Sequence, residues 1–326
     1  MTHSRDLHPG WNPSHWDFDA RGVSTVLDVA LCLVLVSAAV GVLGVYLAAE
    51  DDSETHQTET ADHVVELLGS TTISVEFSFD PLLEHATATD ADVFDEPDDY
   101  PPDERTRVTH GPTAGLLADA TRANLTVDDA WLGHEGAGFE SRLEGPIASE
   151  LFVVDASTAV SASWSPYEDA PLEGRTSVGR TPPPTADVST VTMTVPSGFD
   201  DPALPADTES DHNFDAVAEP VATTIVDGYF PPEQTTLALE RGGLDRDRTV
   251  YRYTRFSNAL EGVEPSDLEE AIAQSTSDAE TANTILVEAL TQKLASDMDS
   301  RFERPADAAD AITVAETTIV VQVWDT

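Results

Sequence analysis

An arginine-rich segment is the most distinctive group of chemically capable side chains in this sequence. It lies within residues 245–260 and contains four of the fifteen arginines, Arg246, Arg248, Arg252 and Arg255. A guanidinium group binds a carboxylate through two parallel hydrogen bonds, so arginines gathered in an acidic chain are expected to have carboxylate partners. Two interpretations remain open: pairing inside one domain, which we favour, and docking of an acidic neighbouring subunit.

Catalytic motifs are absent from the sequence. There is no glycine-rich phosphate loop, no H-E-x-x-H pair and no G-x-S-x-G turn. The acidic segments 90–104 and 200–215 offer oxygen ligands that suit Ca²⁺, but neither has the ordered spacing of a calcium loop. Five histidines also lack metal-ligand spacing, namely His56, His63, His85, His110 and His134. We therefore predict a protein that is not an enzyme and that uses no cofactor or metal.

The sequence has one usable glycosylation sequon. Asn124-Leu125-Thr126 has the acceptor pattern, whereas Pro13 disqualifies Asn12-Pro13-Ser14. The sequon falls at the expected end of a helix, in a part of the chain that we place outside the cell. Asn124 is therefore predicted to accept a glycan.

The composition indicates a folded domain with an acidic surface. The chain has 326 residues, 61 aspartates and glutamates, and a formal net charge of −45. Hydrophobic residues make up 40% and fall into periodic segments, which argues against a disordered acidic chain. With a single lysine, Lys293, the surface resembles that of proteins from salt-loving archaea, where salt screens the repulsion. Phosphates would be repelled, so nucleic-acid binding is excluded.

A long apolar run lies near the amino terminus. Val29–Ala49 contains no charged residue, and it is flanked by Asp28 and by the acids of Glu50–Asp52. Such a run is long enough to cross the roughly 30 Å hydrocarbon core of a lipid bilayer as one helix. Arg5 and Arg21 are the only basic residues before it. The positive-inside rule then places the amino terminus in the cytoplasm and the large carboxy-terminal domain outside.

The residues just before this run resemble a processing site. Arg21-Gly22-Val23 leads through Ser24 into the apolar segment. This junction resembles the class III leader of archaeal type IV pilin-like proteins, and the chain's length resembles that of the pseudopilin-type or Tad-like proteins of haloarchaea. In that family a prepilin peptidase cuts after a basic residue and a glycine, so the resemblance implies cleavage between Gly22 and Val23. The freed helix would then pack against other pilin-like subunits in a filament.

Small residues inside the apolar run would permit such helix packing. They include Ser37, Ala38, Gly41 and Gly44. Small side chains let two helix backbones approach closely. Cys32, the only cysteine, lies in the same run and is interpreted as a packing residue, so no intrachain disulfide is possible.

These patterns predict a non-enzymatic, single-pass, pilin-like protein of the cell membrane of a halophilic archaeon. One alternative is a membrane-tethered binding module, and a less favoured one is an ectoenzyme of unrecognised family. A permanent, uncleaved anchor is as well supported as pilin-like processing. Ordinary signal-peptide cleavage is disfavoured, because the apolar run is longer than the usual core of a secretory signal.

The predicted fold class is α+β, with one transmembrane helix before an extracytoplasmic domain of antiparallel strands and several helices. The expected segments are a cytoplasmic leader or tail (1–22), the transmembrane helix (23–49), an acidic spacer (50–70) and the external domain (71–326). Alternating apolar and polar residues predict strands over 71–79, 159–164, 175–178, 188–195 and 317–324.

Helical periodicity predicts the remaining elements of the external domain. The expected helices cover 111–125, 139–151, 214–229 and 266–302. The last of these is the longest, and it starts with a capping box, Ser266-x-x-Glu269, followed by a continuous apolar stripe.

Overall fold

The structure is a computed structural model, and it describes most of the chain after the apolar run. The described residues are 57–89, 93–95, 99–133, 135–151, 157–205, 213–273 and 277–325. The expected membrane helix lies outside these ranges, as do Gly22, Val23, Ser37, Ala38, Gly41 and Gly44. Within the described ranges, no helix is both long enough and apolar enough to cross a bilayer.

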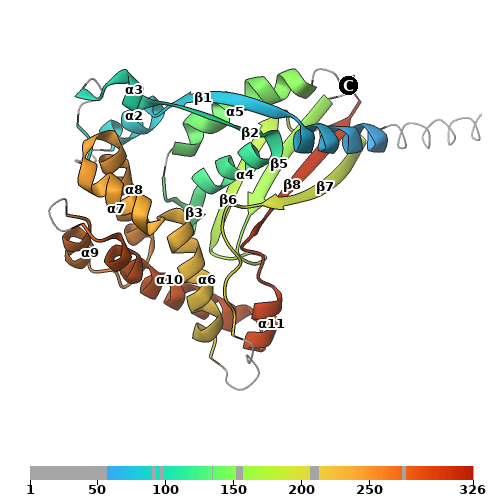
Figure 1. Cartoon of the computed structure of the whole chain (residues 1–326). Helices are drawn as coiled ribbons and strands as arrows, with labels where there is room; N and C mark the ends of the chain where they lie inside the picture. Colours follow the sequence, from blue (N-terminus) through green and yellow to red (C-terminus); the bar gives the residue numbers. More distant parts are fainter. Residues whose placement is uncertain are drawn as a thin grey trace, which may run out of the picture. The chain divides into compact units, whose positions relative to one another are not determined.

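Residues His56–Thr326 form one compact unit of mixed α and β structure (Figure 1). All strand pairs in its two sheets are antiparallel, which confirms the predicted α+β class. The strands are β1 (Thr72–Ser78), β2 (Thr106–Pro112), β3 (Leu125–Val127), β4 (Ala130–Trp131), β5 (Ser157–Trp164), β6 (Leu172–Gly179), β7 (Val188–Pro196) and β8 (Glu316–Trp324).

The larger sheet has six strands in the order β4-β3-β6-β5-β8-β7. The carboxy-terminal strand β8 is an inner strand, because it pairs with both β5 and β7. Strands β1 and β2 form a separate two-stranded sheet. The predicted strands at 71–79, 159–164, 188–195 and 317–324 are confirmed within one or two residues, and the strand predicted at 175–178 is the second half of β6.

Among the described residues, helices pack on one face of the larger sheet. The inward side chains of β5, β6 and β8 alternate with outward ones and pack in one apolar cluster with α4, α5 and the helix at residues 57–70. The helices that follow the one at residues 57–70 are α2 (Asp80–Ala88), α3 (Pro102–Arg105), α4 (Thr113–Ala123), α5 (Glu135–Leu151), α6 (Asp215–Tyr229), α7 (Pro232–Arg241), α8 (Gly243–Ala259), α9 (Pro265–Ile272), α10 (Ala279–Arg301) and α11 (Pro305–Asp310).

A second apolar cluster joins the carboxy-terminal helices to one end of the sheet. It contains buried side chains of α6, α8, α9 and α10, with Leu125, Trp164 and Leu172 from the sheet. Helix α10 packs along α6, and α7 packs along α8 (Figure 1). This cluster positions the carboxyl end of α6 beside α7 and α8, where the groove described below lies.

Two expectations about element boundaries are corrected. Residues 57–70 are not part of a spacer, because they form a helix whose Ala61, Val64 and Leu68 are buried in the domain core. The predicted single helix over 266–302 is two helices, α9 and α10, separated between Ile272 and Ala279. The apolar stripe continues across the interruption because both helices contribute to the same cluster.

The capping box proposed at Ser266 is also wrong. Helix α9 starts at Pro265 after Glu264, without a side-chain cap, since proline at the first position fixes a helical φ and removes one unpaired donor. The side-chain cap belongs to α10, where Asp278 accepts a hydrogen bond from the backbone N–H of Thr281 at 3.2 Å.

Candidate functional site

A cavity opens where α6, α7 and α8 meet. Two adjoining hollows of about 820 and 530 Å³ share Tyr229, Pro231, Gln234 and Arg252 in their walls. They therefore form one continuous groove. We call it the arginine groove, because four arginines line it, namely Arg122, Arg241, Arg248 and Arg252.

Arg252 lies at the point where the two hollows meet. Its Nη2 donates a hydrogen bond to the backbone carbonyl of Tyr229 at 2.7 Å, and its guanidinium lies 4.0 Å from the centre of the Tyr229 ring. The same guanidinium lies 5.1 Å from the Phe230 ring. Cation–π contacts and a carbonyl at the end of α6 thus help to hold the guanidinium in place.

Arg122 lies at the other end of the larger hollow. Its guanidinium donates to the carbonyl of Gly198 at 3.2 Å and to the carboxylate of Asp119 at 3.1 Å. Burial raises the pKa of Asp119 above its usual range, and the neighbouring Arg122 charge opposes that rise. The Arg122–Asp119 pair is therefore a partly desolvated one within the groove wall.

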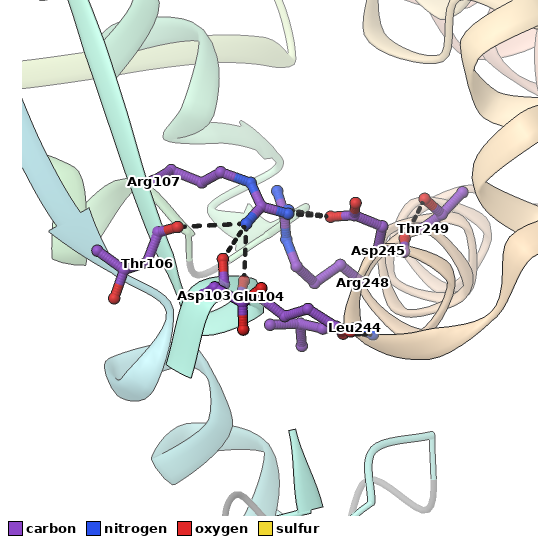
Figure 2. Close-up of polar contacts among 8 residues, drawn as sticks. All are labelled: Asp103, Glu104, Thr106, Arg107, Leu244, Asp245, Arg248 and Thr249. Atoms are coloured by element: carbon purple, nitrogen blue, oxygen red, sulfur yellow. Dashed lines mark hydrogen bonds and ion pairs between the residues drawn. The ribbon is translucent and has the colours of Figure 1, made fainter. Parts of the chain in front are cut away.

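Arg248 belongs to a polar cluster that connects α8 to the β1–β2 sheet (Figure 2). Asp245 accepts hydrogen bonds from Arg248 at 3.2 Å and from Arg107 at 2.9 Å. Arg107 also donates to three backbone carbonyls, those of Asp103, Glu104 and Thr106. The Arg248 guanidinium lies 3.7 Å from the centre of the Phe79 ring, so aromatic contact supplements the ion pair.

Arg241 is the most accessible arginine of the groove. It ends α7, and it makes no hydrogen bond or ion pair with any other residue that the structure describes. A long guanidinium side chain in this position is available to an anion that enters the smaller hollow.

A buried hydrogen-bond network around the side-chain amide of Asn283 joins the helices next to the groove. Asn283 of α10 donates to the carboxylate of Asp227 at 2.8 Å and to the carbonyl of Phe230 at 2.9 Å. Its own carbonyl oxygen accepts a hydrogen bond from the Tyr253 hydroxyl at 2.6 Å. Tyr253 stacks on Phe230 with 3.9 Å between ring centres. One side chain thus joins α6, α8 and α10 at the place where the groove is formed.

The groove is lined by charged side chains of both signs. Six acidic residues line the groove beside the four arginines, and four of the six, Asp119, Asp227, Asp245 and Glu104, accept hydrogen bonds within the domain. No histidine, cysteine or lysine is found among its described lining residues. Across the described ranges, no three His, Cys, Asp or Glu side chains are grouped to hold a metal ion. What the groove offers is guanidinium donors, which suit carboxylate or phosphate oxygens.

Internal pairing with a carboxylate is found for two of the four arginines of the segment 245–260, and docking of a neighbouring subunit is not tested by it. Arg246 lies 3.6 Å from Asp247, and Arg248 pairs with Asp245 as described above. Arg255 donates to the carbonyl of Trp131 at 3.0 Å instead. Sequence reasoning included Arg241, which lies just before the segment 245–260, but it missed Arg122, because Arg122 lies far from the arginine-rich segment in the chain and no motif marks it.

The structure argues against a glycan at Asn124. Its side chain is 2% exposed, and its Nδ2 donates hydrogen bonds to the Arg175 carbonyl and the Thr176 hydroxyl, both at 3.1 Å. The acceptor nitrogen is therefore enclosed between α4 and β6 in the folded domain. The local sequon did not reveal this burial, because the partners lie about fifty residues further along the chain.

Fold and groove together define an α+β domain with an open sheet face and an arginine-lined groove among its helices. The chain belongs to DUF7284, a family of unknown function, whose family model matches residues 27–324. No curated protein and no solved structure matches the chain.

Proposed function

We propose that this protein is a non-enzymatic, single-pass, pilin-like surface protein of a halophilic archaeon, with its folded domain outside the cell membrane. The observation that carries the proposal is the extent of the family match, which begins at Leu27, just before the apolar run Val29–Ala49. The apolar run and the domain are therefore parts of one family unit. A run of this length and composition is suited to a bilayer or to the core of a helical filament.

The way in which the chain enters the domain supports the same proposal. The helix at 57–70 follows the apolar run after a short acidic segment and packs on the sheet through Ala61, Val64 and Leu68. At its start, the Gln57 amide donates to the Asp325 carboxylate at 3.1 Å. The helix that follows the apolar run in the sequence is therefore an integral part of the folded domain.

Determining the mature amino terminus tests the pilin-like part of this proposal. In native protein, mass spectrometry should find a chain that starts at Val23, because the resemblance implies a cut after Gly22. Gly22→Ile should retain the leader and slow migration on a denaturing gel, since a β-branched residue replaces the small one before the cut. Gly10→Ile, in the same leader, is the matched control and should be processed normally.

The outcomes of this test are distinct. An intact Met1 or Thr2 in native protein would overturn processing and leave a permanent anchor. A chain that begins near Glu50 would indicate ordinary signal cleavage. Extraction of the uncleaved chain from membranes by carbonate alone would contradict the anchor itself.

A membrane-tethered binding module is the second candidate function, and the arginine groove favours it. Four of sixteen basic residues line one groove in a chain of net charge −45. A ligand that carries two or more carboxylates would bind through these guanidinium donors, in competition with the six acidic residues that also line the groove.

Titration with citrate tests this second candidate. The full chain in detergent should bind citrate in isothermal titration calorimetry, and Arg241→Gln should weaken binding by about tenfold, the equivalent of one lost charged hydrogen bond. Arg180→Gln, an exposed arginine that does not line the groove, is the matched control and should bind as the parent does. Equal weakening in both variants would indicate a general charge effect and would remove the groove from consideration.

A further inference from the structure

Strand β7 is a long sheet edge that carries no charge. It is the last strand of the six-stranded sheet and pairs only with β8 among the described residues. Its sequence, VSTVTMTVP, contains no acidic or basic residue. Natural proteins usually protect such edges with charges, bulges or short strands, because an open row of N–H and C=O groups templates pairing with another strand.

The other edges of the described sheets are protected in these ways. Strand β4, at the opposite end of the same sheet, has two residues. In the smaller sheet, β1 contains Glu76, and β2 contains Arg107 and His110. In a chain with 61 acidic residues, a nine-residue edge without any charge is therefore an exception that calls for a physical reason.

The solvent face beside the middle of this edge is also uncharged, and Glu316 of β8 lies next to its end, opposite Pro196. The outward residues of β7 are Thr190, Thr192 and Thr194, all exposed. Across the sheet, Thr192 aligns with Val320 of β8, which aligns with Ser161 of β5, and Ser161 aligns with Ser177 of β6. Uncharged side chains thus continue from the edge over four strands, with Val320 between the hydroxyl residues of β7 and β5.

We propose that β7 is a self-pairing edge, which joins two copies of this chain into a continuous antiparallel sheet. The two-fold axis would pass through Thr192, the middle residue of the strand. Antiparallel pairing about that point places Thr190 opposite Thr194 on the outer face and Val191 opposite Met193 on the inner face. Residues that lie opposite each other in an antiparallel pair point to the same face of the sheet. The apolar face and the hydroxyl face of β7 therefore both continue into the second copy.

Charge and symmetry identify a second copy as the occupant. Two chains of net charge −45 repel each other wherever their acidic surfaces meet, and a neutral edge is the place where that repulsion is smallest. A two-fold contact brings the same patch from both partners together, so each side must be compatible with itself. Opposed threonines satisfy this condition and form favourable cross-strand pairs. The inference is independent of the proposed membrane anchoring.

Disulfide trapping tests the contact directly. Cys32 is the only cysteine, so a Cys32→Ala background carries no thiol. In that background, Thr192→Cys should form a linked dimer on mild oxidation of the full chain in detergent, because opposed Cβ atoms on neighbouring strands lie within about 5 Å. Ser163→Cys, on the same exposed face but on the inner strand β5, is the matched control and should stay monomeric.

Charge exchange at the same position gives an independent measurement. Thr192→Asp and Thr192→Lys should each reduce the dimer by about tenfold in light scattering, since like charges then face each other on the axis. Mixing the two variants should restore the dimer, because opposite charges now meet. Circular dichroism of each variant should match the parent, since Thr192 is exposed and outside the core.

The proposal fails if Thr192→Cys links no more than the Ser163→Cys control. It fails equally if the Asp and Lys variants dimerise as the parent does, or if their mixture stays monomeric while both remain folded. Trapping of Thr192→Cys to a different protein in native membranes, without any linked dimer, would assign the edge to another partner and would also overturn the proposal.

Discussion

Replacing Asn283 with leucine should lower the free energy of unfolding by about 3–5 kcal/mol. Asn283 is 3% exposed, and it is the only residue that joins Tyr253, Asp227 and the Phe230 carbonyl through hydrogen bonds among the described contacts. Leucine has a similar volume but leaves the buried Tyr253 hydroxyl without its acceptor. A buried polar group without a hydrogen-bond partner costs about 1–3 kcal/mol, and this substitution removes the partner of more than one such group.

Urea unfolding of the full chain in detergent, followed by tryptophan fluorescence, would measure this loss. Tyr253→Phe removes only the hydroxyl and should cost less, about 1–2 kcal/mol. Thr284→Leu introduces the same side chain at the next, exposed position of α10, and it should change stability by less than about 0.5 kcal/mol. If Asn283→Leu unfolds at the parental urea concentration, the network does not hold α6, α8 and α10 together as we describe.

The same substitution connects stability to the groove. Asp227 lines the larger hollow, and the Phe230 carbonyl follows directly after Tyr229, which contacts Arg252. The position of the central guanidinium therefore depends on a residue that lines neither hollow. This dependence explains why a search for charged residues in the sequence finds Arg252 but not the side chain that positions the end of α6.

Strands with strict alternation were predictable from the sequence. In β1, β5, β7 and β8, apolar and polar residues alternate because helices cover one sheet face and solvent contacts the other. Helix α6 was predictable for a similar reason, since Val217, Val221 and Ile225 recur at helical spacing and are all fully buried.

Elements whose inward residues are not large and apolar could not be predicted fully. The first half of β6 points Leu172 and Gly174 inward, and Thr176 follows on the same face. A glycine and a threonine do not register as core residues in a hydrophobicity pattern. In the structure, Gly174 is required by the closeness of α4, and the Thr176 hydroxyl accepts from Asn124.

Long-range pairing accounts for most of the site that the sequence did not reveal. Arg107 and Asp245 are 138 residues apart, and Arg122 and Gly198 are 76 apart. The composition indicated that arginines would pair with carboxylates, but it could not identify the aspartate or glutamate that each arginine contacts. The break between α9 and α10 was missed because an apolar stripe reports the face that a helix buries and not its continuity.

Gly174→Ala should destabilise the domain by about 3 kcal/mol, because β6 and α4 approach closely at this glycine. A Cβ atom here would lie 2.3 Å from the backbone carbonyl oxygen of Thr121 and 3.1 Å from Cδ2 of Leu125. This carbonyl belongs to the last turn of α4 and accepts a hydrogen bond from the backbone N–H of Asn124, so it cannot rotate away. Either the helix end or the central strand must shift, and both are packed in the core.

Gly115→Ala in α4 is the matched control, with the opposite sign expected. Its Cβ would lie 3.9 Å from Pro112, an ordinary contact, so alanine should stabilise the helix by up to about 1 kcal/mol. Both variants add one methyl group, which would clash with backbone at Gly174 and make an ordinary contact at Gly115, so urea unfolding would place their midpoints on opposite sides of the parent. Equal midpoints would show that α4 can move away from β6 at little cost, and the enclosure of Asn124 between them would then have to be reconsidered as well.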